Sequence, residues 1–96
     1  DKRVTEFIEK YRKKYNGKTP DGLAALGYDA GKILFAAMER APDATSKSIR
    51  DEIAKTKDFT GVTGMITIDA QRNATKSAVV VRVDGKVNRY VTTITP

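Results

Sequence analysis

The residues that most often carry enzyme chemistry are scarce in this chain. Its 96 residues include no histidine and no cysteine, which excludes imidazole and thiolate metal ligands, disulfides and every Ser-His or Cys-His dyad. Asp58, Asp69 and Asp84 fall in three separate predicted turns, so no two carboxylates are placed together for acid–base catalysis. We therefore predict no catalytic residue, no metal site and no cofactor, and a protein that is not an enzyme.

Two weaker motifs have simpler structural explanations. Gly61 and Gly64 are not followed by Gly-Lys-Ser/Thr and do not lie between a strand and a helix, as a phosphate-binding loop requires. We predict that they are turn glycines. Asp69 and Asn73 lack the ligand spacing and the distal glutamate of a calcium loop, and we predict a solvated hairpin loop there.

The net charge of +6 would favour anionic partners. The only basic cluster is Lys10–Lys14 (KYRKK), whereas a nucleic-acid-binding face usually combines basic residues with aromatic rings placed to stack. Tyr11 and Tyr15 instead fall on the apolar stripe of a helix, so we interpret the basic cluster as the solvated back of that helix, with no nucleic acid as partner. The alternative is a complete small basic domain that binds nucleic acid or an acidic protein through this cluster.

Hydrophobic periodicity predicts three helices, over about residues 3–16, 20–41 and 45–56. The apolar residues of the first helix recur at helical spacing, and they are Val4, Phe7, Ile8, Tyr11 and Tyr15. Asn16-Gly17 supplies a left-handed stop. Asp43 or Thr45 can cap the third helix.

The middle helix is the element around which the others must be arranged. Thr19 suits its N-cap and Pro20 its first helical position. Apolar residues occupy nearly all of its faces, which indicates a helix covered on more than one side. Gly27 and Gly31, one turn apart, predict the close approach of a neighbouring backbone.

After residue 57 the period changes to two, which predicts strands over about residues 64–69, 77–84 and 86–94. Ile66 and Ile68 should point to one face of the first strand. Asp84-Gly85 suits a tight hairpin turn. The predicted fold class is α/β, or α+β for these residues alone: three helices followed by a short antiparallel meander.

Six short motifs follow one another along the chain. They are Tyr28-Asp29-Ala30, Ser48-Ile49-Arg50-Asp51-Glu52-Ile53, Asp58-Phe59-Thr60-Gly61-Val62-Thr63-Gly64, Ile66-Thr67-Ile68-Asp69, Lys76 with Ala78-Val79-Val80, and Asp84-Gly85-Lys86. In this order and spacing they resemble the C-terminal part of the branched-chain amino-acid (Leu/Ile/Val) type of solute-binding protein. This is the type I periplasmic binding protein family, which delivers ligands to ABC importers. The resemblance extends over essentially all 96 residues.

The resemblance implies a periplasmic or membrane-anchored extracellular protein with two α/β lobes, which close on an amino acid or related small carboxylate and serve an ABC permease. The present residues would form its last quarter to third. The chain begins with a charged helical segment and no initiator Met, which also suggests part of a longer protein. Its surplus of apolar residues predicts that the isolated chain self-associates.

Tyr28 is the single ligand-binding residue that the resemblance implies, because it matches a position where the family often presents an aromatic ring to the cleft. Without the resemblance, Tyr28 would be interpreted as a core tyrosine with its hydroxyl bonded to the backbone. Asp29 is expected to lie near the helix N-terminus for reasons of helix dipole and hydrogen bonding, rather than to touch ligand. The loop Gln71-Arg72-Asn73 lacks the glycine that the family often carries there, which affects only the expected shape of the turn.

Overall fold

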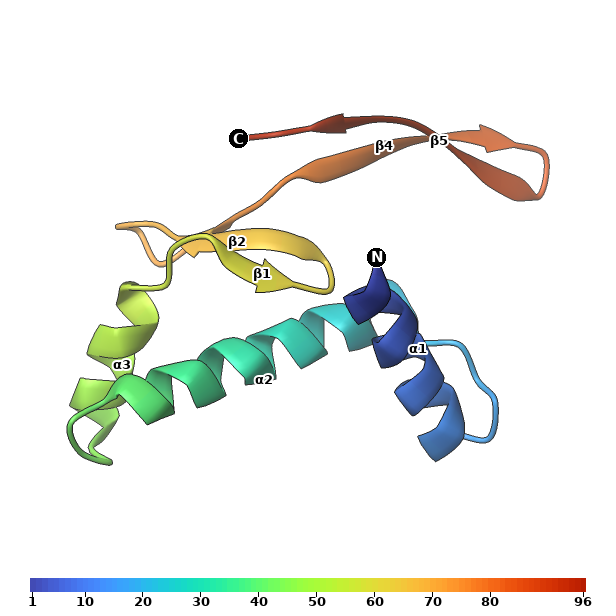
Figure 1. The fold of residues 1–96 in the computed structure, drawn as a ribbon. Helices are drawn as coiled ribbons and strands as arrows, with labels where there is room; N and C mark the ends of the chain where they lie inside the picture. Colours follow the sequence, from blue (N-terminus) through green and yellow to red (C-terminus); the bar gives the residue numbers. More distant parts are fainter.

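The computed structural model describes residues 1–96 as three helices followed by five strands (Figure 1). The helices are α1 (Lys2–Lys14), α2 (Gly22–Arg40) and α3 (Ser46–Ala54). The strands are β1 (Phe59–Gly61), β2 (Gly64–Ile68), β3 (Ala74–Thr75), β4 (Ala78–Asp84) and β5 (Val87–Ile94). The three helices and the antiparallel strands are confirmed, while the short strands β1 and β3 were not predicted.

The helix ends follow from capping side chains. Asp21, rather than Thr19, is the N-cap of α2, and its carboxylate accepts a hydrogen bond from the Ala24 N–H at 2.8 Å. Aspartate is the stronger N-cap of the two residues, so α2 begins after Pro20 and not at it. The left-handed stop after α1 is confirmed, because Asn16 and Gly17 have φ angles of 52° and 80°.

Thr45 is the N-cap of α3, as its Oγ1 accepts a hydrogen bond from the Ser48 N–H at 3.2 Å. Asp43 supports this cap and accepts hydrogen bonds from both the N–H and the hydroxyl of Thr45. The hydrogen bonds from Thr45, and then from the Ser48 side chain, lower the pKa of Asp43 below its ordinary value.

The strands form two separate sheets rather than the single meander that was predicted. β1, β2 and β3 form one antiparallel sheet, and β4 pairs only with β5. Figure 1 shows the β1–β2 hairpin lying along α2, whereas the β4–β5 hairpin projects away from the helices. Its turn is Gly85-Lys86, because Asp84 pairs with Val87, so the predicted turn was one residue too early. Of these two turn residues only Gly85 has a positive φ, 63°, as the first central residue of a type II′ turn requires.

The core lies on one side of α2 and is small. The buried apolar residues are Phe7, Ile33, Ala37 and Ile66. The expectation that α2 is covered on more than one side is wrong for this chain by itself, because large apolar side chains on its other faces are exposed; these are Leu23, Leu26, Leu34, Phe35 and Met38. No atom lies within 4 Å of a Cβ built on Gly27 or Gly31, so the predicted close backbone approach there is also wrong.

The chain is more open than a compact protein of the same size. Its accessible surface is 7585 Å², against about 5,500 Å² for a compact monomer of this mass. Its radius of gyration is 15.8 Å, against about 12.5 Å. Every residue of β4 and β5 is exposed, although a lone two-stranded hairpin is at best marginally stable in water. None of the helices has both the length and the hydrophobicity needed to cross a lipid bilayer.

Candidate functional site

Tyr28 lies in the second turn of α2, and its ring packs against Phe7 of α1. The two ring centroids are 4.7 Å apart with an interplanar angle of 46°, a favourable tilted aromatic arrangement. The Tyr28 side chain is at the border of exposure, with 36% of the residue's surface accessible, and its hydroxyl has no hydrogen-bond partner in the chain. The structure thus does not place Tyr28 as a core tyrosine bonded to the backbone.

Tyr28 forms part of the wall of a cleft between α1, α2 and β1, with a volume of about 290 Å³. This is near the lower end of the range for small-molecule sites. Most of its polar lining is charged, and the charged residues are Arg3, Glu6, Lys10, Asp29 and Lys32. The cleft therefore combines an aromatic wall with ionic groups from both helices.

The free charges in this cleft are positive. Arg3 pairs with Asp1 at 3.1 Å, and Glu6 pairs with Lys2 at 3.8 Å. Lys10 and Lys32 form no ion pair. The Lys32 ammonium lies 5.6 Å from the centroid of the Tyr28 ring, a cation–π distance that follows from their i, i+4 spacing on α2. An aromatic ring beside unpaired ammonium groups suits a small ligand that carries a carboxylate.

Asp29, the next residue after Tyr28, serves a different purpose. It is 2% exposed and points to the turn between β1 and β2. Its two carboxylate oxygens accept hydrogen bonds from the Val62 N–H at 2.8 Å, the Thr63 N–H at 2.9 Å and the Thr63 hydroxyl at 2.6 Å. Asp29 lies two turns into α2, so the expectation that it sits near the helix N-terminus for the dipole is wrong, whereas the expectation that it acts through hydrogen bonds is confirmed.

Three further residues of this network were not singled out from the sequence for these roles. Thr63 contributes two of the hydrogen bonds to Asp29, and the ammonium of Lys76 donates to the Thr63 hydroxyl. Gly61 passes so close to Asp29 that its missing side chain is what makes room for the carboxylate. The sequence signal was present in part: an aspartate in the middle of an apolar helix needs buried donors, and the Gly-Val-Thr-Gly turn supplies them.

The turn residues considered for other chemistry are structural. Asp69 accepts hydrogen bonds from the Gln71 and Asn73 N–H groups at 2.9 and 2.8 Å, which confirms a hairpin loop. Arg72 takes a φ of 70°, a conformation that a glycine would adopt more easily. Asp84 pairs with Arg89 at 2.8 Å. Arg12, Lys13 and Lys14 of the KYRKK cluster are exposed on α1, as expected for the solvated back of a helix, whereas Lys10 is exposed but lines the cleft beside Tyr28.

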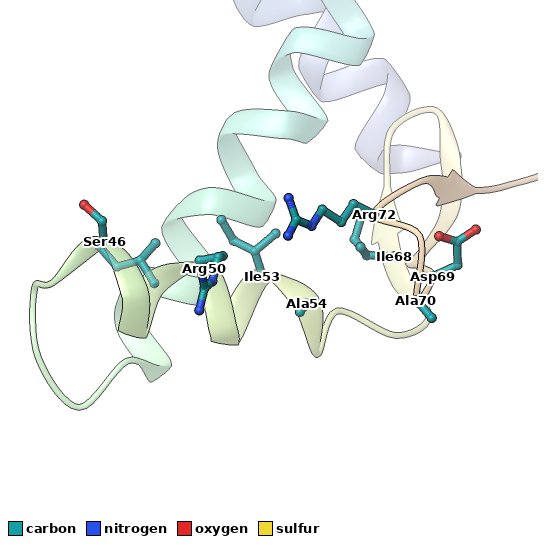
Figure 2. A pocket seen from close by; sticks show the side chains of 9 residues that line it. Ser46, Arg50, Ile53, Ala54, Ile68, Asp69, Ala70 and Arg72 are labelled. Atoms are coloured by element: carbon teal, nitrogen blue, oxygen red, sulfur yellow. The ribbon is translucent and has the colours of Figure 1, made fainter.

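The largest cavity, about 640 Å³, lies elsewhere, between α3 and the loop after β2 (Figure 2). Its walls are mainly aliphatic, from Ile49, Ile53 and Ile68. Arg72 extends toward Ile53, while Asp69 points away from it (Figure 2). Because the Asp69 carboxylate is occupied by its own loop, the polar groups there do not converge as they do around Tyr28. Size alone therefore does not make this cavity the better candidate for a polar solute.

Comparison with protein-family models matches residues 1–88 to the family of periplasmic binding proteins. Among solved structures, a leucine-binding protein from Thermotoga maritima is 40% identical with a TM-score of 0.81, and the match covers 100% of this chain and 27% of that one. A branched-chain amino acid transporter substrate-binding protein from Streptococcus pneumoniae, in complex with isoleucine, is 35% identical with a TM-score of 0.78, covering 95% of this chain and 26% of that one. No match to a curated protein was found.

An ABC transporter substrate-binding protein from Desulfitobacterium hafniense is 26% identical with a TM-score of 0.78, over 95% of this chain and 27% of that one. The chain thus spans about a quarter of the length of these structures. The relatives are solute-binding proteins rather than enzymes. The resemblance found in the six motifs is confirmed, because the family match extends through residue 88 and the fold agrees over the whole chain. The chain belongs to the periplasmic binding protein family.

Proposed function

We propose that these residues form the C-terminal part of a solute-binding protein that captures a branched-chain amino acid, or a related small carboxylate, for an ABC importer. The observation that carries this proposal is the 40% identity to a leucine-binding protein along the entire chain. The isoleucine complex of the second relative supports the same ligand class. Lobe closure on the ligand follows if the ligand binds the closed state more tightly than the open one.

Within this function, Tyr28 is the ligand contact that these residues supply. Its ring is fixed by Phe7 on one side, yet part of it faces the cleft. The unpaired ammonium groups of Lys10 and Lys32 give the cleft a positive charge that attracts a carboxylate. Most of the remaining ligand contacts come from outside these 96 residues, so the isolated chain binds such ligands weakly or not at all.

Isothermal titration of the full-length protein that carries this segment tests both the proposed ligand class and the role of Tyr28. Leucine, isoleucine and valine should bind, and Tyr28→Ala should weaken binding roughly 30-fold, the effect of about 2 kcal/mol that is usual for a central aromatic contact. Tyr90→Ala is the matched control, because Tyr90 is an exposed tyrosine of β5 that lines neither of the two cavities beside Tyr28. It should leave the Kd unchanged.

The two possible failures are distinct. If the unmodified protein binds no amino acid and no small organic acid, the proposed function is wrong. If it binds leucine and Tyr28→Ala binds equally well, the function stands and only the role of Tyr28 is contradicted.

The family implies an extracytoplasmic protein that docks on an ABC permease, and we extend this to the present protein, located in the periplasm or anchored at the outer face of the membrane. An antibody against these residues that detected the protein only in the cytoplasmic fraction would contradict this location.

The isolated 96-residue chain should self-associate. Its surface of 7585 Å² exceeds that of a compact monomer by about 2,100 Å², more than the roughly 800 Å² that a standard protein–protein interface buries on each partner. The exposed valines of the β4–β5 hairpin are part of this surface; they are Val79, Val80, Val81, Val83, Val87 and Val91. Light scattering at high concentration should give a dimer or larger species, and a monodisperse monomer of 10.6 kDa would contradict this.

A further inference from the structure

A chain of hydrogen bonds runs from α2 through the β1–β2 turn to the end of the first sheet. The Asp29 carboxylate accepts from the Thr63 hydroxyl, and the Lys76 ammonium donates to that same hydroxyl. An ammonium group can only donate and an ionised carboxylate can only accept. The hydroxyl proton of Thr63 is therefore directed toward Asp29, and its lone pair toward Lys76, which fixes the direction of every bond. We call Asp29, Thr63 and Lys76 the relay.

The relay joins α2, next to Tyr28, to the segment that leads into β4. Asp29 follows Tyr28 directly on α2. Lys76 comes after β3 and two residues before β4, at the point where the chain leaves the first sheet for the separate β4–β5 hairpin (Figure 1). Lys76 and Ser77 are thus the covalent connection between the rest of the molecule and the hairpin, and Lys76 is hydrogen-bonded through Thr63 to the helix that carries Tyr28.

The relay is also complete within this chain. Asp29 is buried and its oxygens are satisfied by Val62 and Thr63, so its geometry does not depend on a partner. The exposed apolar faces of α2 and of the β4–β5 hairpin, in contrast, are not covered by other parts of this chain. Each hydrogen bond of the relay joins one ionised group to the neutral Thr63 hydroxyl. Such charge-assisted hydrogen bonds are stronger than neutral ones, and shielding from water strengthens them further.

We propose that Asp29, Thr63 and Lys76 are positioning residues for ligand binding. They hold the β1–β2 turn, where Gly61 and Val62 line the cleft, in a fixed relation to Tyr28, so that less ordering is needed when the ligand binds. This inference rests on the proposed function, because it takes the cleft beside Tyr28 as the ligand-binding site. Without the Thr63 hydroxyl, Lys76 loses its acceptor and the segment leading to β4 can move independently of α2.

Titration of the full-length protein with leucine tests the proposal. Thr63→Val removes both hydrogen bonds of the relay and Lys76→Met removes one, but either change disconnects Lys76 from Asp29, so each should weaken binding about tenfold. Thr63→Ser keeps the hydroxyl and should restore wild-type affinity. The double variant should bind no more weakly than either single variant, because both changes break the same relay. Lys57→Met is the matched control, since Lys57 is exposed and forms no ion pair.

Wild-type affinity in both single variants, or strictly additive losses in the double variant, would overturn the proposal. A lower melting temperature with an unchanged Kd would also overturn it, because the relay would then be only structural. If the unmodified protein fails to bind leucine, the proposed function is wrong. The coupling between Lys76 and the β1–β2 turn is then tested by hydrogen exchange of the ligand-free protein. Lys76→Met should then accelerate exchange at the Val62 and Thr63 amides, and unchanged exchange would refute the coupling.

Discussion

Asp29→Ala is expected to lower the free energy of unfolding by about 3 kcal/mol, because it removes a buried carboxylate that accepts three hydrogen bonds. The N–H groups of Val62 and Thr63 would lose their acceptor in a part-buried turn, where water cannot fully replace it. The turn that joins β1 to β2 is also the main polar contact between the sheet and α2. Its loss should loosen the sheet as well as the turn.

Urea denaturation at matched protein concentration measures this loss, since self-association would otherwise shift the apparent stability. Asp51→Ala is the control, because Asp51 is an exposed helical aspartate whose one ion pair, with Arg50 at 3.2 Å, contributes at most about 1 kcal/mol. The loss in the free energy of unfolding for Asp29→Asn should fall between those for Asp29→Ala and Asp51→Ala. Its amide keeps one acceptor oxygen but turns two N–H donors toward the donors of the turn. Equal losses for Asp29→Ala and Asp51→Ala would contradict the burial argument.

The elements that the sequence predicts well are those specified by neighbouring residues. The stripe of α1 as far as Tyr11, the left-handed stop at Asn16-Gly17 and the burial of Ile66 all depend on local periodicity or local backbone conformation. The same holds for the Thr45 cap of α3. The prediction for Tyr15 is wrong, because the helix ends at Lys14 and the Tyr15 side chain is exposed. The contact between Asp29 and Thr63 is different, because the two residues are 34 positions apart and no periodic pattern relates them.

The hydrophobic pattern of α2 illustrates a second limit. Leu23, Phe35 and Met38 indicate a helix that is covered on several sides, yet all three are exposed. A hydrophobic pattern reflects the surroundings in the whole protein, whereas these residues span only about a quarter of the length of their relatives. The prediction that α2 is covered on several sides is therefore wrong because the hydrophobic pattern suits a larger fold than these 96 residues form. A further part of such a fold would cover the exposed faces of α2.

The candidate site was reached by resemblance rather than by periodicity. Tyr28 by itself looks like one of several apolar residues of α2, and only the Tyr28-Asp29-Ala30 motif singles it out. Its packing against Phe7 could not be predicted, because it depends on the angle at which α1 crosses α2. The position of Lys32 beside Tyr28 could have been predicted from the sequence, since residues at i and i+4 share a helix face.

Gly61→Ala is the second substitution with a large expected effect, a loss of about 2–3 kcal/mol in the free energy of unfolding. A Cβ at this position would lie 2.5, 2.6 and 2.8 Å from three atoms of the Asp29 carboxylate, distances that non-bonded atoms do not adopt. Asp29 cannot swing aside without losing its hydrogen bonds to Val62 and Thr63. Gly61 cannot retreat without breaking its pairing with Gly64. The methyl group must therefore displace either the carboxylate or the strand.

Gly27→Ala provides a control with the opposite sign. No atom lies within 4 Å of its Cβ position, so alanine there should stabilise α2 by up to about 1 kcal/mol through helix propensity alone.

The steric argument also predicts that the losses for Asp29→Ala and Gly61→Ala are not additive, because the methyl group at position 61 meets no carboxylate once Asp29 is alanine. Urea denaturation of the four proteins in this cycle should show that Gly61→Ala costs little in the Asp29→Ala background. A full loss in that background would mean that the backbone of β1, and not the buried carboxylate, requires glycine at this position.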